Sequence, residues 1–314
     1  MRIPVLKTSD FLTLTDISSE EMIKLFEFTA YLKKNAKKGK FKKYLKNRTL
    51  AMIFEKNSTR TRVSFETGMH QLGGHALFLS STDIQLGRGE TIADTAKVLS
   101  RYNSGIMIRT FEHEKIMTLA HHASIPVING LSDSFHPCQA LADYFTIYER
   151  EKNLSRVKIT YIGDGNNVAN SLLLGAALLG IDITIACPKK YSPEMSILEK
   201  AFKISSATDS NIMITTDANE AVQGSDYIYT DVWISMGQEK ESAKKRKAFS
   251  KYRVTEELLA RTGKDTKILH CLPAYRGEEI TEGVLDSPAS IVFDQAENRL
   301  HCQKAVMCAL MGRK

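Results

Sequence analysis

The chain of 314 residues alternates short apolar segments with amphipathic segments of helical length, from residue 50 almost to its end. Such alternation constrains the fold strongly, because successive strands separated by helices pair in parallel. It therefore predicts an α/β protein built from parallel sheets flanked by helices. The apolar segments, each expected to be a strand, are residues 50–54, 75–80, 105–109, 126–131, 157–163, 182–188, 212–217, 226–233 and 267–273.

The length of the chain predicts two domains, since single hydrophobic cores stop growing beyond roughly 250–300 residues. The polar stretch EREKNLSR, residues 149–156, separates two rounds of alternation and places the boundary near Asn153. We expect a first domain over residues 1–150 and a second over 151–293, joined by interdomain helices. The last segment, residues 294–314, is predicted to be a long helix that packs back on the first domain.

The segment FEKNSTRTR, residues 54–62, places arginines and hydroxyls where a strand gives way to a helix. Helix N-termini expose unpaired N–H groups and carry partial positive charge, so they bind anions, and arginine adds bidentate donors to phosphate oxygens. One hydroxyl would suffice to cap the helix, but three are interleaved with the arginines. The segment therefore predicts a phosphate site, although the GxxxxGK[ST] pattern of a P-loop is absent.

Two further polar positions follow predicted strands of the first half. Arg109 ends an apolar strand, where an arginine is usually paired or liganded. The motif HPCQ puts His136 and Gln139 three residues apart at a strand-to-helix turn, on one side of the helix. There they could donate to a carbonyl and accept from an amide, although His136 could equally be a simple hydrogen-bonding residue at the helix start.

The segment TYIGDGNNVANS, residues 160–171, is similar to a dinucleotide-binding fingerprint. The third glycine position holds Val168, and a lone GxG is weak evidence. An NAD-dependent oxidoreductase therefore stays open as an alternative function. The side-chain amides of Asn166 and Asn167 suit hydrogen bonds to a small polar molecule at this strand-to-helix turn.

Asp231 and Cys271 each lie at the end of an apolar strand of the second half. The carboxylate of Asp231 could hold an ammonium group, or it could cap the next turn. Cys271 could help a nearby amine to lose its proton, although a buried cysteine is more often a small apolar side chain. The densely charged stretch 238–252, which follows Asp231, is expected to be exposed.

The net charge of +7 is a reason to consider nucleic-acid binding. Much of the excess lies in residues 31–48, which carry eight lysines and one arginine. No nucleic-acid-binding motif and no aromatic platform accompany this stretch, so we expect a solvated face and no nucleic-acid partner. A noncatalytic basic binding protein is the alternative, but it would leave the motifs above without a role.

The five cysteines are odd in number and include no CxxC pair. They predict reduced thiols of a cytoplasmic protein, with neither a disulfide framework nor a metal site. No apolar run approaches the ~20 residues that span a bilayer. The segment MRIPVLKTSDF lacks the apolar region of a secretory signal, so we expect no membrane association.

Together, these motifs resemble those of the aspartate/ornithine carbamoyltransferase family. The resemblance extends over nearly the whole chain and keeps the family's order: STRTR, a Gln-Leu-Gly loop, HPCQ, GDGNN, DVWISMGQE, HCLPAYRGEE and AENR. STRTR with HPxQ is typical of the superfamily, and SMG with HCLP is typical of its ornithine branch. At the positions of SMG and HCLP, aspartate enzymes carry arginine- and glutamine-bearing segments. Putrescine enzymes usually lack the SMG loop.

The resemblance implies that the δ-amine of ornithine attacks carbamoyl phosphate, giving citrulline and phosphate in arginine metabolism, with biosynthesis as the expected direction. It implies that the first domain binds carbamoyl phosphate and the second binds ornithine, with Arg109, His136 and Cys271 as catalytic residues. The implied carbamoyl phosphate ligands are Ser58, Thr59, Arg60, Thr61, Gln85, Arg109, His136, Gln139, Cys271, Leu272 and Arg299. The implied ornithine ligands are Asn167, Asp231, Ser235 and Met236.

The resemblance also implies a homotrimer or a multiple of trimers, and no metal or organic cofactor. Gln85, in the loop STDIQLGRGET, would reach the carbamoyl phosphate of an adjacent subunit, although family members vary at this position. Arg88 in the same loop is a second candidate donor. Putrescine and N-acetylornithine are alternative acceptors, but neither offers the α-ammonium group that Asp231 is expected to bind.

Overall fold

The computed structural model describes residues 1–87, 89–151, 153–234 and 241–312. The chain forms two compact units: the first comprises Met1–Phe145 and Glu297–Lys314, and the second comprises Thr146–Ala296. Both divisions lie inside helices, namely α5 (Pro137–Glu151) and α12 (Val292–Met311). Each of these helices therefore contributes residues to both units.

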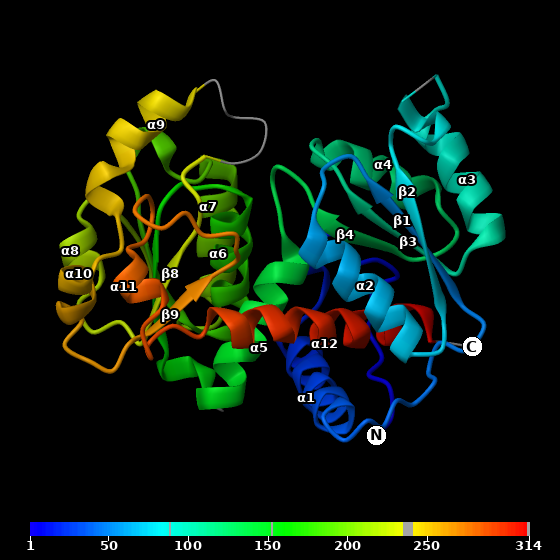
Figure 1. Ribbon diagram of the computed structural model, residues 1–314, viewed down its shortest axis with the longest axis horizontal. Coiled ribbons are helices and arrows are strands. Elements are labelled where there is room, and N and C mark those ends of the chain that lie inside the picture. Colours follow the sequence, from blue (N-terminus) through cyan, green and yellow to red (C-terminus); the bar gives the residue numbers. More distant parts are fainter. Residues whose placement is uncertain (88, 152, 235–240, 313–314) are drawn as a thin grey trace. The chain divides into compact units, whose positions relative to one another are not determined.

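The first unit is built on a parallel sheet with the strand order β2-β1-β3-β4 (Figure 1). In the three strands β1, β3 and β4 nearly every residue is buried, as expected of apolar strands covered on both faces. The edge strand β2 is only partly buried. The strands are β1 (Thr49–Phe54), β2 (His75–Ser80), β3 (Gly105–Arg109) and β4 (Val127–Leu131).

Helices cover both faces of this sheet. On one face, Ala96 of α3 and Ile116 of α4 share a core with Ile53 and Ile108 of the sheet. Elsewhere in the unit α2 packs closely on α12, because a Cβ atom at Gly68 would lie 2.9 Å from the Cε atom of Met307. Besides parts of α5 and α12, the unit contains α1 (Ser19–Ala36), α2 (Thr59–Gln71), α3 (Ile92–Tyr102), α4 (His113–His122) and short 3-10 turns at Leu14–Asp16 and Gln85–Gly87.

The second unit is built on a five-stranded parallel sheet with the order β7-β6-β5-β8-β9 (Figure 1). Its strands are β5 (Lys158–Ile162), β6 (Asp182–Ala186), β7 (Ile212–Thr215), β8 (Tyr227–Thr230) and β9 (Lys267–His270). The larger helices are α6 (Asn167–Leu179), α7 (Met195–Ser205) and α9 (Ser242–Phe249). Shorter helices are α8 (Ala218–Ala221), α10 (Glu256–Ala260) and α11 (Glu282–Leu285), with 3-10 turns at Leu154–Arg156, Lys189–Tyr191 and Ser250–Tyr252. The α/β class predicted from the alternation of strands and helices is confirmed.

In each unit, the strand order indicates the edge of the sheet where a ligand is expected to bind. In open α/β sheets, ligands bind outside the carboxyl ends of the strands, where the strand order reverses. This reversal lies between β1 and β3 in the first unit and between β5 and β8 in the second. The register brings Phe54 opposite Arg109 in the first sheet and Ile162 opposite Thr230 in the second. The residues that follow these strand ends are therefore neighbours.

The charged stretch 238–252 differs from its expected exposure. Within its described part, α9 buries Lys245 and places Phe249 in a core with Trp233 and Tyr252. The expectation was wrong at these positions, because the described part is helical and buries the side chains of Lys245, Phe249 and Tyr252. Separately, no helix in the described part of the chain is both long and apolar enough to cross a membrane.

Candidate active site

In the first unit, the end of β1 leads into α2 through a capped N-terminus. Ser58 is the N-cap, and its Oγ accepts a 3.2 Å hydrogen bond from the Thr61 main-chain N–H. The Oγ of Ser58 also donates to the hydroxyl of Thr61 at 3.1 Å. From α12, Nη2 of Arg299 donates to the same hydroxyl at 3.0 Å. The start of α2 thus combines helix N–H groups, hydroxyls and a guanidinium group, which together suit a phosphate.

Arg109 is the last residue of β3 and is buried. Its Nε donates to the main-chain oxygen of Lys56 at 3.2 Å, which fixes the guanidinium group beside the β1–α2 connection. Lys56 is also buried, pairs with Asp133 and has its Nζ 4.2 Å from the centre of the Phe111 ring. These contacts therefore hold the positively charged side chains of Arg109 and Lys56 in place.

His136 and Gln139 lie at the start of α5, after β4. Only 5% of His136 is exposed, and burial together with the charges of Arg299, Arg109 and Arg60 holds its pKa well below the usual 6.5. The ring is therefore neutral at pH 7 and can donate one N–H to a substrate oxygen. Gln139 is 1% exposed and donates through Nε2 to Asp143 at 2.8 Å. Its Oε1 accepts no hydrogen bond from any described residue, which leaves an amide oxygen able to accept from a ligand.

In the second unit, Asp231 follows β8 and is 5% exposed. Its carboxylate accepts three hydrogen bonds of 2.8 Å, from Asn166 Nδ2, the Sγ of Cys271 and the main-chain N–H of Val232. Asn166 is also the N-cap of α6, since its Oδ1 accepts from the N–H groups of Val168 and Ala169. Asn167 is the first residue of α6 and is partly exposed. A carboxylate held by three hydrogen bonds therefore lies where the strand order of the second sheet reverses.

The turn after β9 is fixed by hydrogen bonds of the His270 ring. Leu272 has a left-handed backbone (φ +57°), and its N–H donates to Nδ1 of His270 at 2.8 Å. The other ring nitrogen of His270 lies 3.1 Å from Oε1 of Glu279. Possible ligand atoms of Asp231, His270 and Cys271 lie within 4.8 Å of one another, as in a metal site. Because both ring nitrogens of His270 are already engaged, this group is arranged as a hydrogen-bond network.

The GDGNN turn after β5 is closed by protein rather than open for a dinucleotide. A Cβ atom at Gly165 would lie 2.3 Å from the main-chain nitrogen of Pro193. In dinucleotide sites, the corresponding glycine lets the backbone approach a pyrophosphate, but here chain fills that space. Asp164 instead pairs with the buried Lys245 at 2.5 Å, while its burial raises its carboxyl pKa. These contacts speak against the NAD-dependent alternative.

The structure describes only one of the four remaining candidate residues. Gln85 lies in the Gln85–Gly87 turn and is exposed. Ser235, Met236 and Arg88 lie outside the described residues. Reasoning from the sequence assigned the Asn166 amide to a small polar molecule and missed its hydrogen bond to Asp231. An asparagine just before a helix is a capping signal, which could have indicated a structural role for this side chain. The same reasoning also missed Lys245, for which a densely charged stretch offers no signal.

Family models match both halves of the chain. Residues 9–149 match the carbamoyl-P binding domain of aspartate/ornithine carbamoyltransferase, and residues 155–310 match its Asp/Orn binding domain. The chain is 54% identical over 306 residues to an ornithine carbamoyltransferase of Anoxybacillus flavithermus, covering 98% of each chain. It is 57% identical over 307 residues to an ornithine carbamoyltransferase of Oceanobacillus iheyensis, covering 98% of this chain and 95% of the relative.

Solved structures are similar over the same extent. An ornithine carbamoyltransferase from Pyrococcus furiosus is 48% identical, with a TM-score of 0.95 and full coverage of both chains. An anabolic ornithine carbamoyltransferase from Campylobacter jejuni is 43% identical, with a TM-score of 0.90 over 96% of this chain and 99% of that one. The likeness in sequence and in fold therefore extends through both units.

Proposed function

The chain belongs to the aspartate/ornithine carbamoyltransferase family, and from this membership we infer that it transfers the carbamoyl group of carbamoyl phosphate to the δ-amine of L-ornithine. The products are L-citrulline and phosphate. The observation that carries this inference is the cluster of three arginines around the neutral His136, beside the N-terminus of α2. We assign carbamoyl phosphate to the first unit and ornithine to the second.

The start of α2 binds the phosphate group in this proposal. Ser58, Thr59, Arg60 and Thr61 supply main-chain and side-chain donors, and Arg299 completes the set through its contact with Thr61. The leaving group is a dianion, so negative charge grows on the phosphate oxygens as the bond to the carbonyl carbon breaks. Fixed donors at such positions are usually the largest catalytic contribution, and removal of one costs on the order of 3 kcal/mol.

The carbonyl group is polarised by donors that also lie in the first unit. Arg109 bridges the phosphate and carbonyl oxygens, and His136 and Thr61 donate to the carbonyl oxygen. The neutral state of His136 favours donation without adding a fourth positive charge to the arginine cluster. The carbamoyl amide donates to Oε1 of Gln139 and to the main-chain oxygens of Cys271 and Leu272. The unpartnered Gln139 oxygen supports this assignment among the described residues.

Ornithine is bound through its amino-acid head. The carboxylate of Asp231 receives the α-ammonium group, and Asn167, Ser235 and Met236 are the remaining ornithine residues of the proposal. Putrescine has no such head and N-acetylornithine has no α-ammonium, so an ordered carboxylate at Asp231 favours ornithine itself. Cys271, hydrogen-bonded to Asp231, orients the δ-amine and helps it to lose its proton.

The δ-amine must be neutral to attack the carbonyl carbon. An amine of this type has a reference pKa of about 10.4, so only a small fraction is neutral at pH 7. The turnover rate is therefore expected to rise with pH through neutrality. The positions of both substrates on fixed elements supply a further large share of the barrier reduction, because reaction within one complex avoids the entropic cost of encounter. The loss of the amine proton and the attack on the carbonyl carbon require neither a metal ion nor an organic cofactor.

A homotrimer, or a multiple of trimers, is the proposed assembly. The first unit exposes several large apolar side chains, which an interface with other subunits would cover. They come from α2, β2 and α3: Val63, Leu77, Val98 and Tyr102. The exposed Gln85 lies in the connection between β2 and α3 and would reach the carbamoyl phosphate of a neighbouring subunit.

A cytoplasmic location and a biosynthetic direction complete the proposal. The five cysteines form no disulfide, which suits a reducing compartment. One of the similar solved structures is titled as an anabolic enzyme, which supports citrulline formation as the physiological direction.

The test is citrulline or carbamoyl-amine formation from carbamoyl phosphate with ornithine, putrescine, N-acetylornithine and aspartate in parallel. Strong turnover with ornithine alone is expected. Turnover with putrescine or N-acetylornithine instead would overturn the role of Asp231 while leaving the phosphate assignment standing. Turnover with none of the four amines would overturn the proposed reaction.

A further inference from the structure

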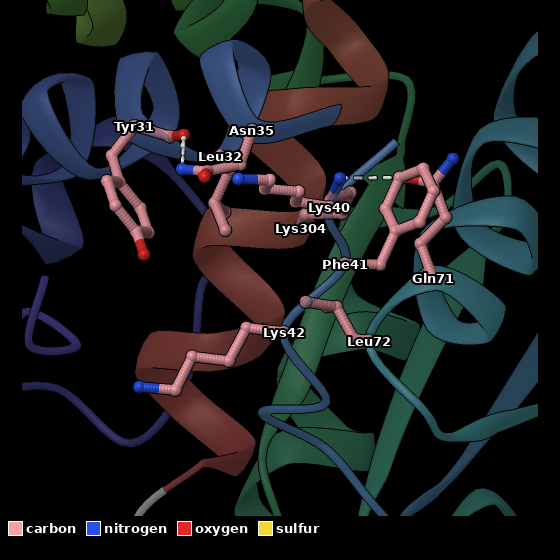
Figure 2. A pocket seen from close by; sticks show the side chains of 9 residues that line it. All are labelled: Tyr31, Leu32, Asn35, Lys40, Phe41, Lys42, Gln71, Leu72 and Lys304. Carbon is pink, nitrogen blue, oxygen red and sulfur yellow. Dashed lines mark hydrogen bonds between the residues drawn. The ribbon is translucent and has the colours of Figure 1, made fainter. Parts of the chain in front are cut away.

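A pocket of about 250 Å³ lies in the first unit, lined by α1, the segment after it, the end of α2 and α12 (Figure 2). Asn35, Lys40, Phe41, Gln71 and Lys304 are among its lining residues. None of them takes part in the proposed reaction. The pocket also contains part of the lysine-rich stretch for which that reaction offers no role.

The floor of the pocket holds a buried cation. Lys304 is only 2% exposed, and its Nζ donates to Oε1 of Gln71 at 2.7 Å beside the ring of Phe41 (Figure 2). No carboxylate of the described residues lies within 4.0 Å of this ammonium group. Burial lowers the pKa of Lys304 to about 8. A buried ammonium whose hydrogen-bond acceptor is neutral is better satisfied by an anion.

The rest of the lining adds a second charge and an apolar wall. Lys40 is exposed and also lines the pocket. Lys42 contributes less charge, because its side chain points away from Lys304 and its Nζ lies 4.8 Å from the centre of the Tyr44 ring (Figure 2). Phe41 and the buried Leu72 provide apolar surface. The pocket therefore offers one buried and one exposed ammonium group next to an aromatic ring.

We propose that this pocket binds a small organic anion, whose charged group pairs with Lys304 and Lys40 while its apolar body lies against Phe41. Its volume of about 250 Å³ lies just below the roughly 300–1,000 Å³ of typical small-molecule pockets, which suits an anion of the size of benzoate. Carboxylates and phosphates share the chemistry that would satisfy Lys304, and the two are separated by experiment.

The pocket is connected to the phosphate site by two helices. Gln71 ends α2 and Lys304 belongs to α12, and the same helices carry Thr61 and Arg299, which are joined by a hydrogen bond. Between these contacts the helices touch at Gly68. An anion that draws Lys304 away from Gln71 removes a polar contact between α2 and α12. The expected result, which rests on the proposed function, is a changed KM for carbamoyl phosphate.

Binding is tested by isothermal titration of the full chain with benzoate and with inorganic phosphate. Because phosphate should also bind at the start of α2, its titration uses an Arg60→Gln background. Replacing Lys304 by Met keeps the aliphatic stem and removes the charge, so binding should weaken about 10-fold or more. Lys38→Met, at an exposed lysine of the same stretch that does not line the pocket, should leave affinity unchanged.

The Gln71→Leu variant is expected to change anion affinity in the opposite direction to Lys304→Met. It removes the competing neutral acceptor and keeps Lys304, so anion binding should tighten. This variant also serves if circular dichroism shows that Lys304→Met does not fold. Binding of benzoate alone identifies a carboxylate site, and binding of phosphate alone identifies a phosphate site.

Three results would overturn the proposal: no heat of binding with either probe, equal affinity in Lys304→Met and the parent protein, or equal losses in Lys304→Met and Lys38→Met. These titrations need no turnover, so they stand or fall separately from the proposed reaction.

Discussion

The side-chain amide of Asn166 holds Asp231 through a 2.8 Å hydrogen bond while its oxygen caps α6. One residue thus links the start of a helix to the carboxylate proposed to bind the ornithine head. The two tasks use different atoms of the same side chain, so substitutions can separate them.

Asn166→Ser keeps a capping hydroxyl but removes the donor to Asp231. We expect KM for ornithine to rise about 10-fold, with KM for carbamoyl phosphate nearly unchanged, since a hydrogen bond to a charged group is lost. Asn166→Ala should show the same kinetic loss and also lose about 1 kcal/mol of unfolding free energy with the cap. Steady-state kinetics and urea unfolding measure the two effects. An unchanged ornithine KM in Asn166→Ser would show that Asn166 only caps the helix.

Thr61→Val removes the hydroxyl that Arg299 contacts and keeps the side-chain shape. Because this hydroxyl is assigned to the carbonyl and phosphate oxygens, we expect kcat/KM for carbamoyl phosphate to fall roughly 100-fold, with ornithine KM little changed. Ser64→Ala is the matched control, since among the described residues the Ser64 hydroxyl donates only to the main-chain oxygen of Thr61 in the same helix. Equal kinetics for the two variants would contradict the assignment.

The lowered pKa of His136 makes stability depend on pH. Burial and then Arg299, Arg109 and Arg60 hold that pKa well below 6.5. Between the two values the unfolded chain binds a proton that the native chain does not. The free energy of unfolding should therefore fall as the pH drops below about 6.5, by up to about 1.4 kcal/mol per pH unit.

Urea unfolding at several pH values between 7.5 and 5 measures this effect. His136→Gln should reduce the slope of stability against pH, whatever its effect at pH 7.5. His121→Gln, at an exposed histidine of α4, should leave the slope unchanged. Parallel pH curves for all three proteins would mean that the pKa of His136 is the same in the native and the unfolded chain, which would contradict the lowered pKa.

Lys245→Met leaves Asp164 buried without its ammonium partner. Removal of one member of a buried ion pair typically costs about 3–5 kcal/mol, so a comparable loss of unfolding free energy is expected. The double variant Asp164→Asn with Lys245→Met should recover most of it, because no uncompensated charge remains. Arg276→Gln, in an exposed pair with Asp286, should have a much smaller effect. A double variant no more stable than Lys245→Met would refute this account.

Two glycine substitutions separate a steric clash from backbone strain. At Gly165 an added Cβ meets the backbone of Pro193, whereas at Gly224 (φ +68°) it meets nothing within 4 Å. Gly224→Ala should cost about 1–2 kcal/mol from its left-handed backbone alone. Gly165→Ala should cost more than Gly224→Ala, about 3 kcal/mol, since main chain must move. Thermal or urea unfolding ranks the two, and an equal cost would mean that the Ser192–Pro193 segment yields easily.

The alternation of strands and helices predicted the α/β class because the two periodicities differ so clearly along this chain. The residues at the strand ends were predicted for the same reason: Arg109 ends β3, and Asp231 and Cys271 follow β8 and β9. The strand order was beyond reach from periodicity. The strand order depends on which strand edges pair inside the protein. This order makes the ends of β5 and β8 neighbours.

Features that depend on long-range pairing were also missed. The position of Lys245 follows from its contact with Asp164, 81 residues earlier, and local charge density pointed the other way. The pocket around Lys304 likewise combines segments from α1 to α12. In both cases a lysine is buried because of distant partners, which no local pattern encodes.

The hydrogen bond between Thr61 and Arg299 joins residues 238 positions apart. A ribosome adding about 5–20 residues per second needs roughly 12–50 s to make that interval of chain. During this time the first sheet can form, but α2 begins without the last of its proposed phosphate ligands. The nascent protein therefore holds an incomplete phosphate site until synthesis is almost finished, and a chain that ends before α12 would never complete it.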